Sequence, residues 1–199
     1  VPPAGPGGVL RYGPGFHDVS EVKIGKGIRT IWIDPAATIR GRFKIDSAEN
    51  VTITGGGTID NGTVKRGEDS GFALFLIASR KLTVENVTIL DNPGWNVVLA
   101  NSEDVRLSHV RILGARATSD GFDVCNSRRV TVADSFVRNW DDAIAIKGVE
   151  GFGMGSSPVE DLTVVRSTFL CDNGWGQPFA VGFETFADRI RRVRIEDCD

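Results

Sequence analysis

The sequence has few of the residues that bind zinc or cross-link a chain. Its 199 residues include two histidines and three cysteines, Cys125, Cys171 and Cys198. None of these cysteines belongs to a CxxC pair, so we do not expect a zinc site. Because their number is odd, at least one thiol must be free or paired with another chain. We interpret all three as half-buried structural thiols, which leaves the cellular compartment open.

Long apolar runs and an excess of positive charge are also missing. No segment approaches the roughly 18 apolar residues that a membrane-spanning helix needs, and no signal peptide is recognisable. The net charge of −3 and the pI of about 5.5 argue against nucleic-acid binding, which usually requires a basic surface. We therefore expect no membrane or nucleic-acid partner. The chain begins at Val1 rather than Met, as a processed or trimmed chain does, and we expect a secreted or periplasmic location.

Long helical periodicity is absent, and a repeat of short alternating runs takes its place. Six copies open with an apolar–polar–apolar triplet, and these triplets start at Val51, Leu82, Val105, Val130, Leu162 and Val193. The steps between them are 31, 23, 25, 32 and 31 residues. A step in the low twenties is about one turn of a three-faced coil of strands, and a longer step is the same turn with an inserted loop. Stacked coils bury the inner face of each strand, which a single coil cannot do.

A recurring serine supports this interpretation. Ser79, Ser102 and Ser127 each stand three residues before a triplet, which predicts a ladder of hydroxyl groups at one turn. The sequence therefore predicts an all-β fold, a right-handed single-stranded parallel β-helix. An antiparallel β-sandwich is the alternative, but it would not readily explain the shared register.

The predicted solenoid forms one domain over residues 1–199. We expect an irregular N-terminal segment at residues 1–27 and coils from about residue 28 onward. Residues 30–46 look like one more, less regular coil. Because the chain stops inside a repeat at Asp199, we expect it to be part of a longer β-helix.

The strands that precede the triplets align without gaps at residues 72–79, 95–102 and 120–127, and residues 142–148 continue the pattern. The alignment predicts two inward columns, Leu74, Val97, Phe122 and Ile144, and then Leu76, Leu99, Val124 and Ile146. It also predicts an outward column at the strand entrance, Phe72, Trp95, Asp120 and Asp142. Asp120 and Asp142 should then be neighbours on adjacent coils, about 4.8 Å apart.

Asp141 stands one residue before Asp142, where turn geometry can aim its side chain at the same space. Three carboxylates in a small area raise one another's pKa. Acid–base chemistry at a glycosidic bond needs this arrangement, because one carboxyl must stay protonated while another activates water. We therefore predict Asp120, Asp141 and Asp142 as the catalytic residues.

Other side chains near these carboxylates are candidates for substrate binding: Trp95, Asp123, Lys147, Trp175 and Glu184. Lys147 can supply compensating charge, and the two indole rings suit the C–H faces of sugars. A purely structural role is the alternative for each of these residues. An aspartate at a strand entrance, for example, often only forms a turn. Both tryptophans can be packing residues, and the other three can be structural or surface charges. A calcium site made by three aspartates is a further alternative.

Three segments resemble, in order, the motifs of glycoside hydrolase family 28, the polygalacturonases and their relatives. They are TSDGFDV at 118–124, WDDAIAIKG at 140–148 and GWG at 174–176. In the family the motifs are Asn-Thr-Asp, Asp-Asp, Gly-His-Gly and Arg-Ile-Lys. The resemblance covers roughly residues 28–199. It implies a parallel β-helix and an inverting hydrolase without a cofactor, in which Asp120 and Asp142 hold the attacking water and Asp141 protonates the leaving oxygen.

The sequence departs from the family pattern at several motif positions. Thr118 and Ser119 replace Asn-Thr, Trp175 stands in place of the histidine, and no Arg-Ile-Lys follows. The missing groups are positively charged ones that would favour a galacturonate carboxylate. A neutral polysaccharide is therefore at least as well supported as pectin. The chain is similar in this respect to the related dextranase and isopullulanase family, which also looks like a β-helix with three aspartates.

We therefore predict a glycoside hydrolase that cleaves a polysaccharide or oligosaccharide with inversion, without a metal or cofactor. One alternative is a polysaccharide lyase, which would usually need calcium and a basic residue in the groove. Another is a β-helix that binds carbohydrate without turnover.

Overall fold

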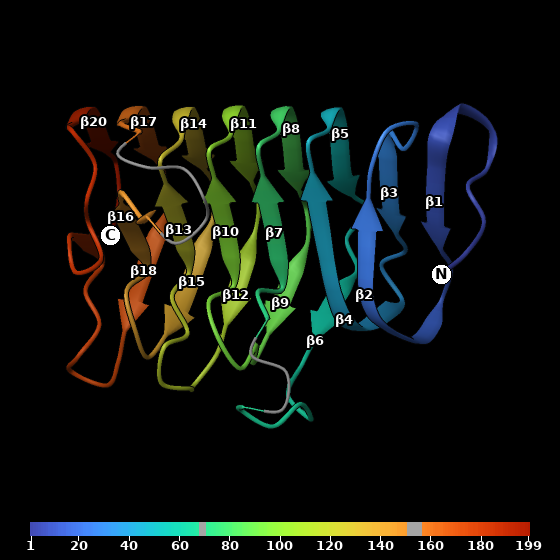
Figure 1. Ribbon diagram of the computed structural model, residues 1–199. Coiled ribbons are helices and arrows are strands. Elements are labelled where there is room, and N and C mark those ends of the chain that lie inside the picture. The colour runs from blue at the N-terminus through green and yellow to red at the C-terminus, as the bar shows by residue number, and fades with distance from the viewer. Residues whose placement is uncertain (68–70, 151–156) are drawn as a thin grey trace.

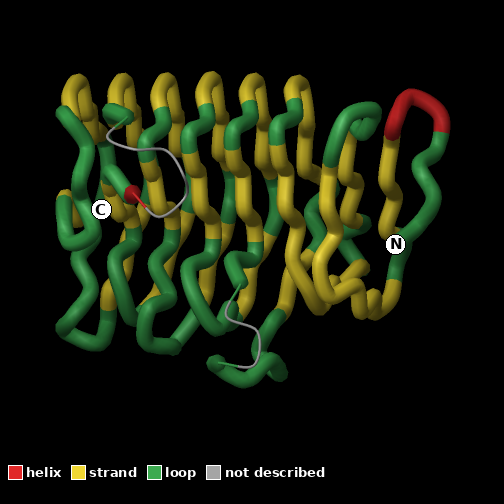
Figure 2. Tube along the Cα trace, in the orientation of Figure 1, coloured by secondary structure: helices red, strands yellow, loops and turns green. Residues whose placement is uncertain are grey.

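The computed structural model describes residues 1–67, 71–150 and 157–199 of the chain. These residues form strands joined by turns and loops, together with the 3-10 helix η1 (Pro6–Gly8). Figure 1 shows the chain winding as a stack of coils from the N-terminus at one end to the C-terminus at the other. In the tube of Figure 2, strands of successive coils lie beside one another along each face. Among the described residues, no helix has the length and apolarity needed to cross a membrane.

One face of the stack is an eight-stranded sheet in which all pairs are parallel. In spatial order its strands are β1 (Val9–Tyr12), β3 (Thr30–Ile33), β5 (Glu49–Thr54), β8 (Arg80–Glu85), β11 (Glu103–Ser108), β14 (Arg128–Ala133), β17 (Val159–Val165) and β20 (Ile190–Glu196).

A twelve-stranded sheet supplies the remaining strands in two limbs that meet at β4 (Ala37–Asp46), on which β2 (Gly15–Ile24) also pairs. The first limb contains β6 (Thr58–Asp60), β9 (Thr88–Leu90), β12 (Arg111–Leu113), β15 (Phe136–Asn139) and β18 (Thr168–Cys171). The second limb contains β7 (Leu74–Ile77), β10 (Val97–Ala100), β13 (Phe122–Cys125), β16 (Ile144–Lys147) and β19 (Phe179–Val181). The second limb carries the candidate active site.

The register predicted from the triplets is confirmed at every coil. The six triplet starts pair in one continuous column, Val51, Leu82, Val105, Val130, Leu162 and Val193. The two inward columns of the second limb are also confirmed. Their side chains join one buried core along the axis of the stack. The prediction of a parallel β-helix is therefore confirmed, and the antiparallel sandwich is wrong because every strand pair in the described sheets is parallel.

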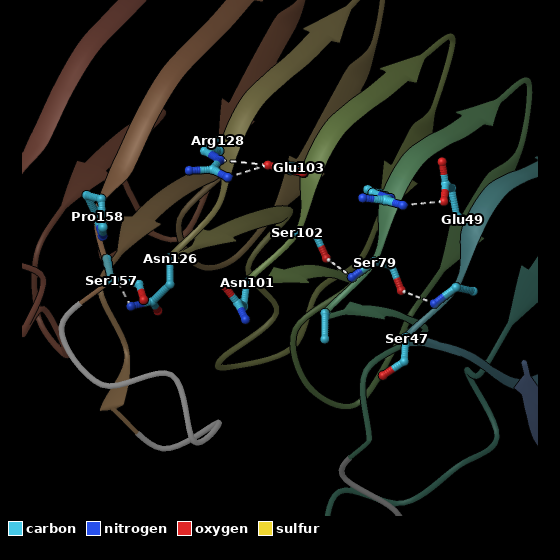
Figure 3. Close-up of a pocket in the computed structure, with 13 residues that line it drawn as sticks. Ser47, Glu49, Ser79, Asn101, Ser102, Glu103, Asn126, Arg128, Ser157 and Pro158 are labelled. Carbon is cyan, nitrogen blue, oxygen red and sulfur yellow. Dashed lines mark hydrogen bonds and ion pairs between the residues drawn. The ribbon is translucent and has the colours of Figure 1, made fainter.

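The serine ladder is confirmed as well. Ser79 Oγ accepts a hydrogen bond from Ala48 N at 3.1 Å, and Ser102 Oγ accepts one from Ser79 N at 3.2 Å. Ser127 Oγ continues the ladder by accepting from Ser102 N at 3.0 Å. Figure 3 shows the first two of these contacts. Each hydroxyl thus satisfies a backbone donor of the preceding coil, where the sharp turn leaves no strand partner.

Opposite charges alternate along the same turn. Glu49, Arg80, Glu103, Arg128, Glu160 and Arg191 occupy one column on successive coils. Nitrogen–oxygen distances in three of these pairs are 2.7 Å for Arg80–Glu49, 2.7 Å for Arg128–Glu103 and 2.8 Å for Arg191–Glu160. We refer to this column as the charge ladder. It favours one pairing of the coils, because a shift by one coil would set like charges side by side.

The N-terminal segment differs from the expectation of an irregular structure over residues 1–27. Strands β1 and β2 fall within it and pair with β3 and β4. Here the alternation is interrupted by a register shift between Asp18 and Ser20. In the eight-stranded sheet the coil spacing is kept, because Val9 pairs with Thr30 and Thr30 pairs with Thr52, at steps of 21 and 22 residues. Gly8 and Arg29 precede the first two of these residues, where the later triplets begin with an apolar residue, so the first coils lack the pattern by which the later coils were recognised.

Candidate active site

Asp120 and Asp142 stand at the entrances of neighbouring strands, as the alignment predicted. Phe122 of β13 pairs with Ile144 of β16, and Gly121 N donates to Asp142 O at 2.8 Å. The two aspartates therefore occupy equivalent positions on adjacent coils. They lie at the N-terminal ends of β13 and β16. A polar cavity of about 530 Å³ lies instead near the C-terminal ends of β7, β10 and β13 (Figure 3).

Two buried asparagines hold the turns that lead to these aspartates. Asn139 Nδ2 donates to Ser119 O at 2.8 Å and to Asp142 O at 3.0 Å, so it ties the two turns together. Asn96 Nδ2 donates to Ser119 O at 3.2 Å and to Asp120 O at 2.9 Å. The sequence interpretation missed both residues. Their signal was an asparagine next to a tryptophan at each of two strand entrances.

Glycine is required at two positions where backbones approach closely. A Cβ atom on Gly121 would lie 2.4 Å from Ala143 O. A Cβ atom on Gly176 would lie 2.2 Å from Asp141 O. The second contact packs the Gly-Trp-Gly segment against the backbone of Asp141, so this loop lies directly beside the carboxylates.

Asp141 and Asp142 are both half-buried, with defined contacts. Asp142 Oδ1 accepts a hydrogen bond from Gln177 N at 2.9 Å, and Asp141 Oδ1 accepts one from Asp142 N at 3.1 Å. Burial raises the pKa of Asp142, the Gln177 amide opposes this rise, and the negative charge of Asp141 adds to it. Asp142 therefore holds a proton more readily than an ordinary aspartate.

Asp120 is almost fully buried, with 3% of its surface exposed. Lys147 Nζ lies 2.7 Å from its Oδ2 atom. Burial raises the pKa of Asp120, Lys147 opposes the rise, and Asp141 adds to it. The charge of Asp141 thus acts on both Asp120 and Asp142, so the three carboxylates form one electrostatic cluster.

Lys147 is not a surface charge, because only 4% of it is exposed. Its Nζ atom also lies 2.9 Å from Asp123 Oδ1, 3.5 Å from Glu184 Oε2 and 3.8 Å from the centre of the Trp95 ring. Burial alone would lower the pKa of Lys147, but Asp123 and Asp120 outweigh it and raise the pKa. The structure therefore gathers four of the predicted site residues around one ammonium group.

The remaining candidate residues differ in accessibility. Trp95 is half-buried and stacks on Phe72 with ring centroids 5.4 Å apart and planes 10° from parallel. Trp175 is 85% exposed on the loop after β18. Glu184 is exposed in the segment after β19, whereas Asp123 is fully buried. The assignment of these residues and Lys147 to substrate binding stays a prediction.

The calcium alternative meets an obstacle in this arrangement. That alternative uses oxygen atoms of Asp120, Asp141 and Asp142, which Asp123 could join. However, the Lys147 ammonium already lies 2.7 Å from Asp120 Oδ2 and 2.9 Å from Asp123 Oδ1, where it would repel a calcium ion. Within the described ranges, no group of three or more His, Cys, Asp or Glu residues is arranged to hold a metal ion.

Comparison with known proteins identifies the family. The model of the family described as glycosyl hydrolases family 28 matches residues 20–198. The chain belongs to this family. Family 28 membership agrees with the resemblance of the aspartate motifs, and the motifs lie on the second limb, where Asp120 meets Asp142.

Several relatives of the chain are polygalacturonases by name. A probable polygalacturonase of Vitis vinifera is 26% identical over 130 residues, which are 63% of this chain and 26% of that protein. An endo-polygalacturonase of Pectobacterium carotovorum subsp. carotovorum is 24% identical over 121 residues, which are 60% of this chain and 28% of that protein. The match thus spans about a quarter of the length of these relatives.

Solved structures share the fold. A polygalacturonase from Erwinia carotovora ssp. carotovora superposes with a TM-score of 0.79 at 17% identity, covering 96% of this chain and 61% of that one. An exopolygalacturonase from Thermotoga maritima gives a TM-score of 0.75 at 18% identity, covering 97% of this chain and 59% of that one.

Proposed function

We propose that this chain carries the catalytic carboxylates of a β-helical glycoside hydrolase that cleaves polysaccharide bonds with inversion. The observation that carries the proposal is the convergence of Asp120, Asp141 and Asp142 at the entrances of β13 and β16. Inversion requires an acid and a base separated by about 6.5–9.5 Å, so that a water molecule fits between the base and the sugar.

The environments of the three carboxylates suit different roles. Asp120 is paired with Lys147, which favours its ionised form and suits a residue that holds and activates water. The family resemblance assigns the same role to Asp142 and the acid role to Asp141. The opposite assignment for this pair, with Asp142 as the acid, is the alternative; burial raises the pKa of Asp142 as it raises that of Asp120, so variants of the pair decide between the two.

Paired variants separate these two assignments. A variant that lacks the acid should still cleave a substrate whose leaving group needs no protonation, such as an activated aryl glycoside. A variant that lacks the base should fail on both activated and natural substrates. Asp141→Asn and Asp142→Asn, compared on both kinds of substrate, therefore show which residue donates the proton.

Polygalacturonan is the proposed substrate, because the relatives in family 28 are named for that activity. A neutral polysaccharide is the second candidate. It is favoured by Trp175, whose exposed indole beside the carboxylates can pack on an uncharged sugar ring, where the family motif has a histidine. Polygalacturonan is an extracellular polymer, which supports a secreted or periplasmic location.

A panel of polysaccharides with products followed by NMR tests the proposal. Hydrolysis with inversion gives new reducing ends whose first-formed anomer is opposite to that of the cleaved bond. A lyase would instead give unsaturated products. Binding without turnover would support a carbohydrate-binding β-helix and contradict the proposal.

A further inference from the structure

The buried ammonium of Lys147 lies behind Asp120 rather than in an open groove. The ammonium nitrogen lies 2.7 Å from Asp120, which stands at the entrance of β13, and 2.9 Å from Asp123, which lies within β13. The Trp95 ring covers the ammonium at 3.8 Å from the ring centre. Because Lys147 and Asp123 are both almost fully buried, a substrate has little access to either.

The charges in this cluster do not balance if every group is ionised. Two buried carboxylates would then share one buried ammonium, and an uncompensated buried charge is costly. Asp123 is the more deeply buried carboxylate, at 0% exposed. Among the described residues, none donates a well-aligned hydrogen bond to its two oxygen atoms. A proton on Asp123 removes the excess charge, and it sits beside Asp120, because Asp120 Oδ2 and Asp123 Oδ1 lie 2.7 and 2.9 Å from the same ammonium nitrogen.

We infer that Asp123 and Lys147 are positioning residues: a neutral Asp123 carboxyl and the Lys147 ammonium together hold Asp120 as an oriented carboxylate at the reacting centre. The inference rests on the proposed function, because it assigns Asp120 the role of a base. It replaces direct substrate binding as the role of these two residues.

Groups on the surrounding elements agree with this distribution of charge. Asp141 and Asp142 face Asp120 from the entrance of β16, and Glu184 approaches Lys147 from the segment after β19. Cys125 follows on β13, and burial raises the pKa of its thiol, which keeps it neutral. Burial and the neighbouring Asp120 raise the pKa of Asp123 well above its ordinary value. Asp123 is therefore the carboxyl in this cluster best suited to carry the proton.

Two substitutions separate the contributions of charge and shape. Lys147→Met removes the ammonium from Asp120, and an opposite charge at this distance lowers an aspartate pKa by about one to three units. The acid limb of the pH–rate profile should therefore move upward by about one to three pH units. Asp123→Asn replaces a neutral carboxyl by a neutral amide of the same shape, so the limb should move by less than about half a unit.

Two controls accompany these variants. Lys147→Arg retains the positive charge, so the acid limb of its pH–rate profile should lie close to that of the unmodified protein. Lys44→Met removes a lysine from β4 of the same sheet, where Lys44 faces the Phe75 ring at 5.7 Å and pairs with Asp46 at 3.1 Å. Strand β4 is three strands away from β13, so this variant should leave the acid limb of the pH–rate profile unchanged.

NMR titration of the aspartate carboxyl carbons in the unmodified full chain gives an independent answer without substrate. Asp123 should remain protonated at a pH at which Asp120 is already ionised. The reverse order, or a downward shift of the acid limb in Asp123→Asn, would overturn the inference. A folded Lys147→Met variant with an unmoved limb would also overturn it. If no polysaccharide is cleaved, the proposed function fails, and the titration still decides the charge state of Asp123.

Discussion

Asn139 connects the two turns that present the catalytic carboxylates, so its removal tests whether those turns set the geometry of the site. The perturbation is Asn139→Ala. It deletes the hydrogen bonds to Ser119 O at 2.8 Å and to Asp142 O at 3.0 Å while leaving every carboxylate in place.

The expected loss of stability follows from the partners that remain. Ser119 O still accepts a hydrogen bond from Asn96, and Asp142 O still accepts one from Gly121. Neither carbonyl is left unsatisfied, so each lost bond costs only about 0.5–1.5 kcal/mol. The free energy of unfolding should therefore fall by about 1–3 kcal/mol, which leaves the chain folded. A misplacement of about 1 Å can cost on the order of 100-fold in rate, so we expect kcat to fall by about 10- to 100-fold.

Urea unfolding and steady-state kinetics measure the two effects separately. Asn61→Ala is the control, because Asn61 is also a buried asparagine that bonds another coil, with Gly41 N of β4 at 2.9 Å, Gly41 O at 3.1 Å and Asn92 Oδ1 at 2.9 Å. It should lose at least as much stability with a nearly unchanged kcat. A kcat of Asn139→Ala within about twofold of the unmodified protein would refute the idea that these turns hold the reacting groups in place.

Three further predictions concern the core, the charge ladder and the exposed Trp175. Phe122→Ala should lower the free energy of unfolding by about 3–5 kcal/mol in urea titrations, because Phe122 is fully buried between coils, and a loss below about 1 kcal/mol would contradict its place in the core. Ion pairs with basic neighbours lower the pKa of Glu49 and Glu160 to about 2, so their stabilisation is present above about pH 4.3 and is lost as the pH falls toward 2. Glu160→Gln should reduce this acid loss in urea midpoints, and an unchanged pH dependence would count against the ladder. Trp175→Ala should raise KM with little change in Tm, whereas an unchanged KM would exclude a sugar contact.

The register of the coils could be predicted from the sequence because alternation has a period of two. Gap-free alignment of three strand segments fixes which residues face the core, and a slip of one residue would reverse every face. The position of Asp120 beside Asp142 follows from this register alone. Strand β1 was not recognised, since Gly8 stands where the later triplets begin with an apolar residue, although the coil spacing is kept. Strand β2 was not recognised because the register shift between Asp18 and Ser20 interrupts its alternation.

The environment of Lys147 could not be predicted in the same way. Lysine is rarely buried, so a lysine after an apolar run indicates a strand end at the surface. Its burial depends on Asp123, Trp95 and Glu184, which approach from three different coils. The roles of Asn96 and Asn139 likewise depend on backbone carbonyls of other coils, and side-chain types alone do not reveal such contacts.

The stereochemistry and residue dependence of bond cleavage test the central claim most directly. The measurement is NMR detection of the first-formed anomer on polygalacturonan and neutral polysaccharides, with the unmodified protein and with Asp142→Asn. The account predicts hydrolysis with inverted configuration and a loss of several orders of magnitude in the variant, with its fold retained. Near-normal turnover by folded Asp142→Asn, or no cleavage of any polysaccharide by the unmodified protein, would contradict it.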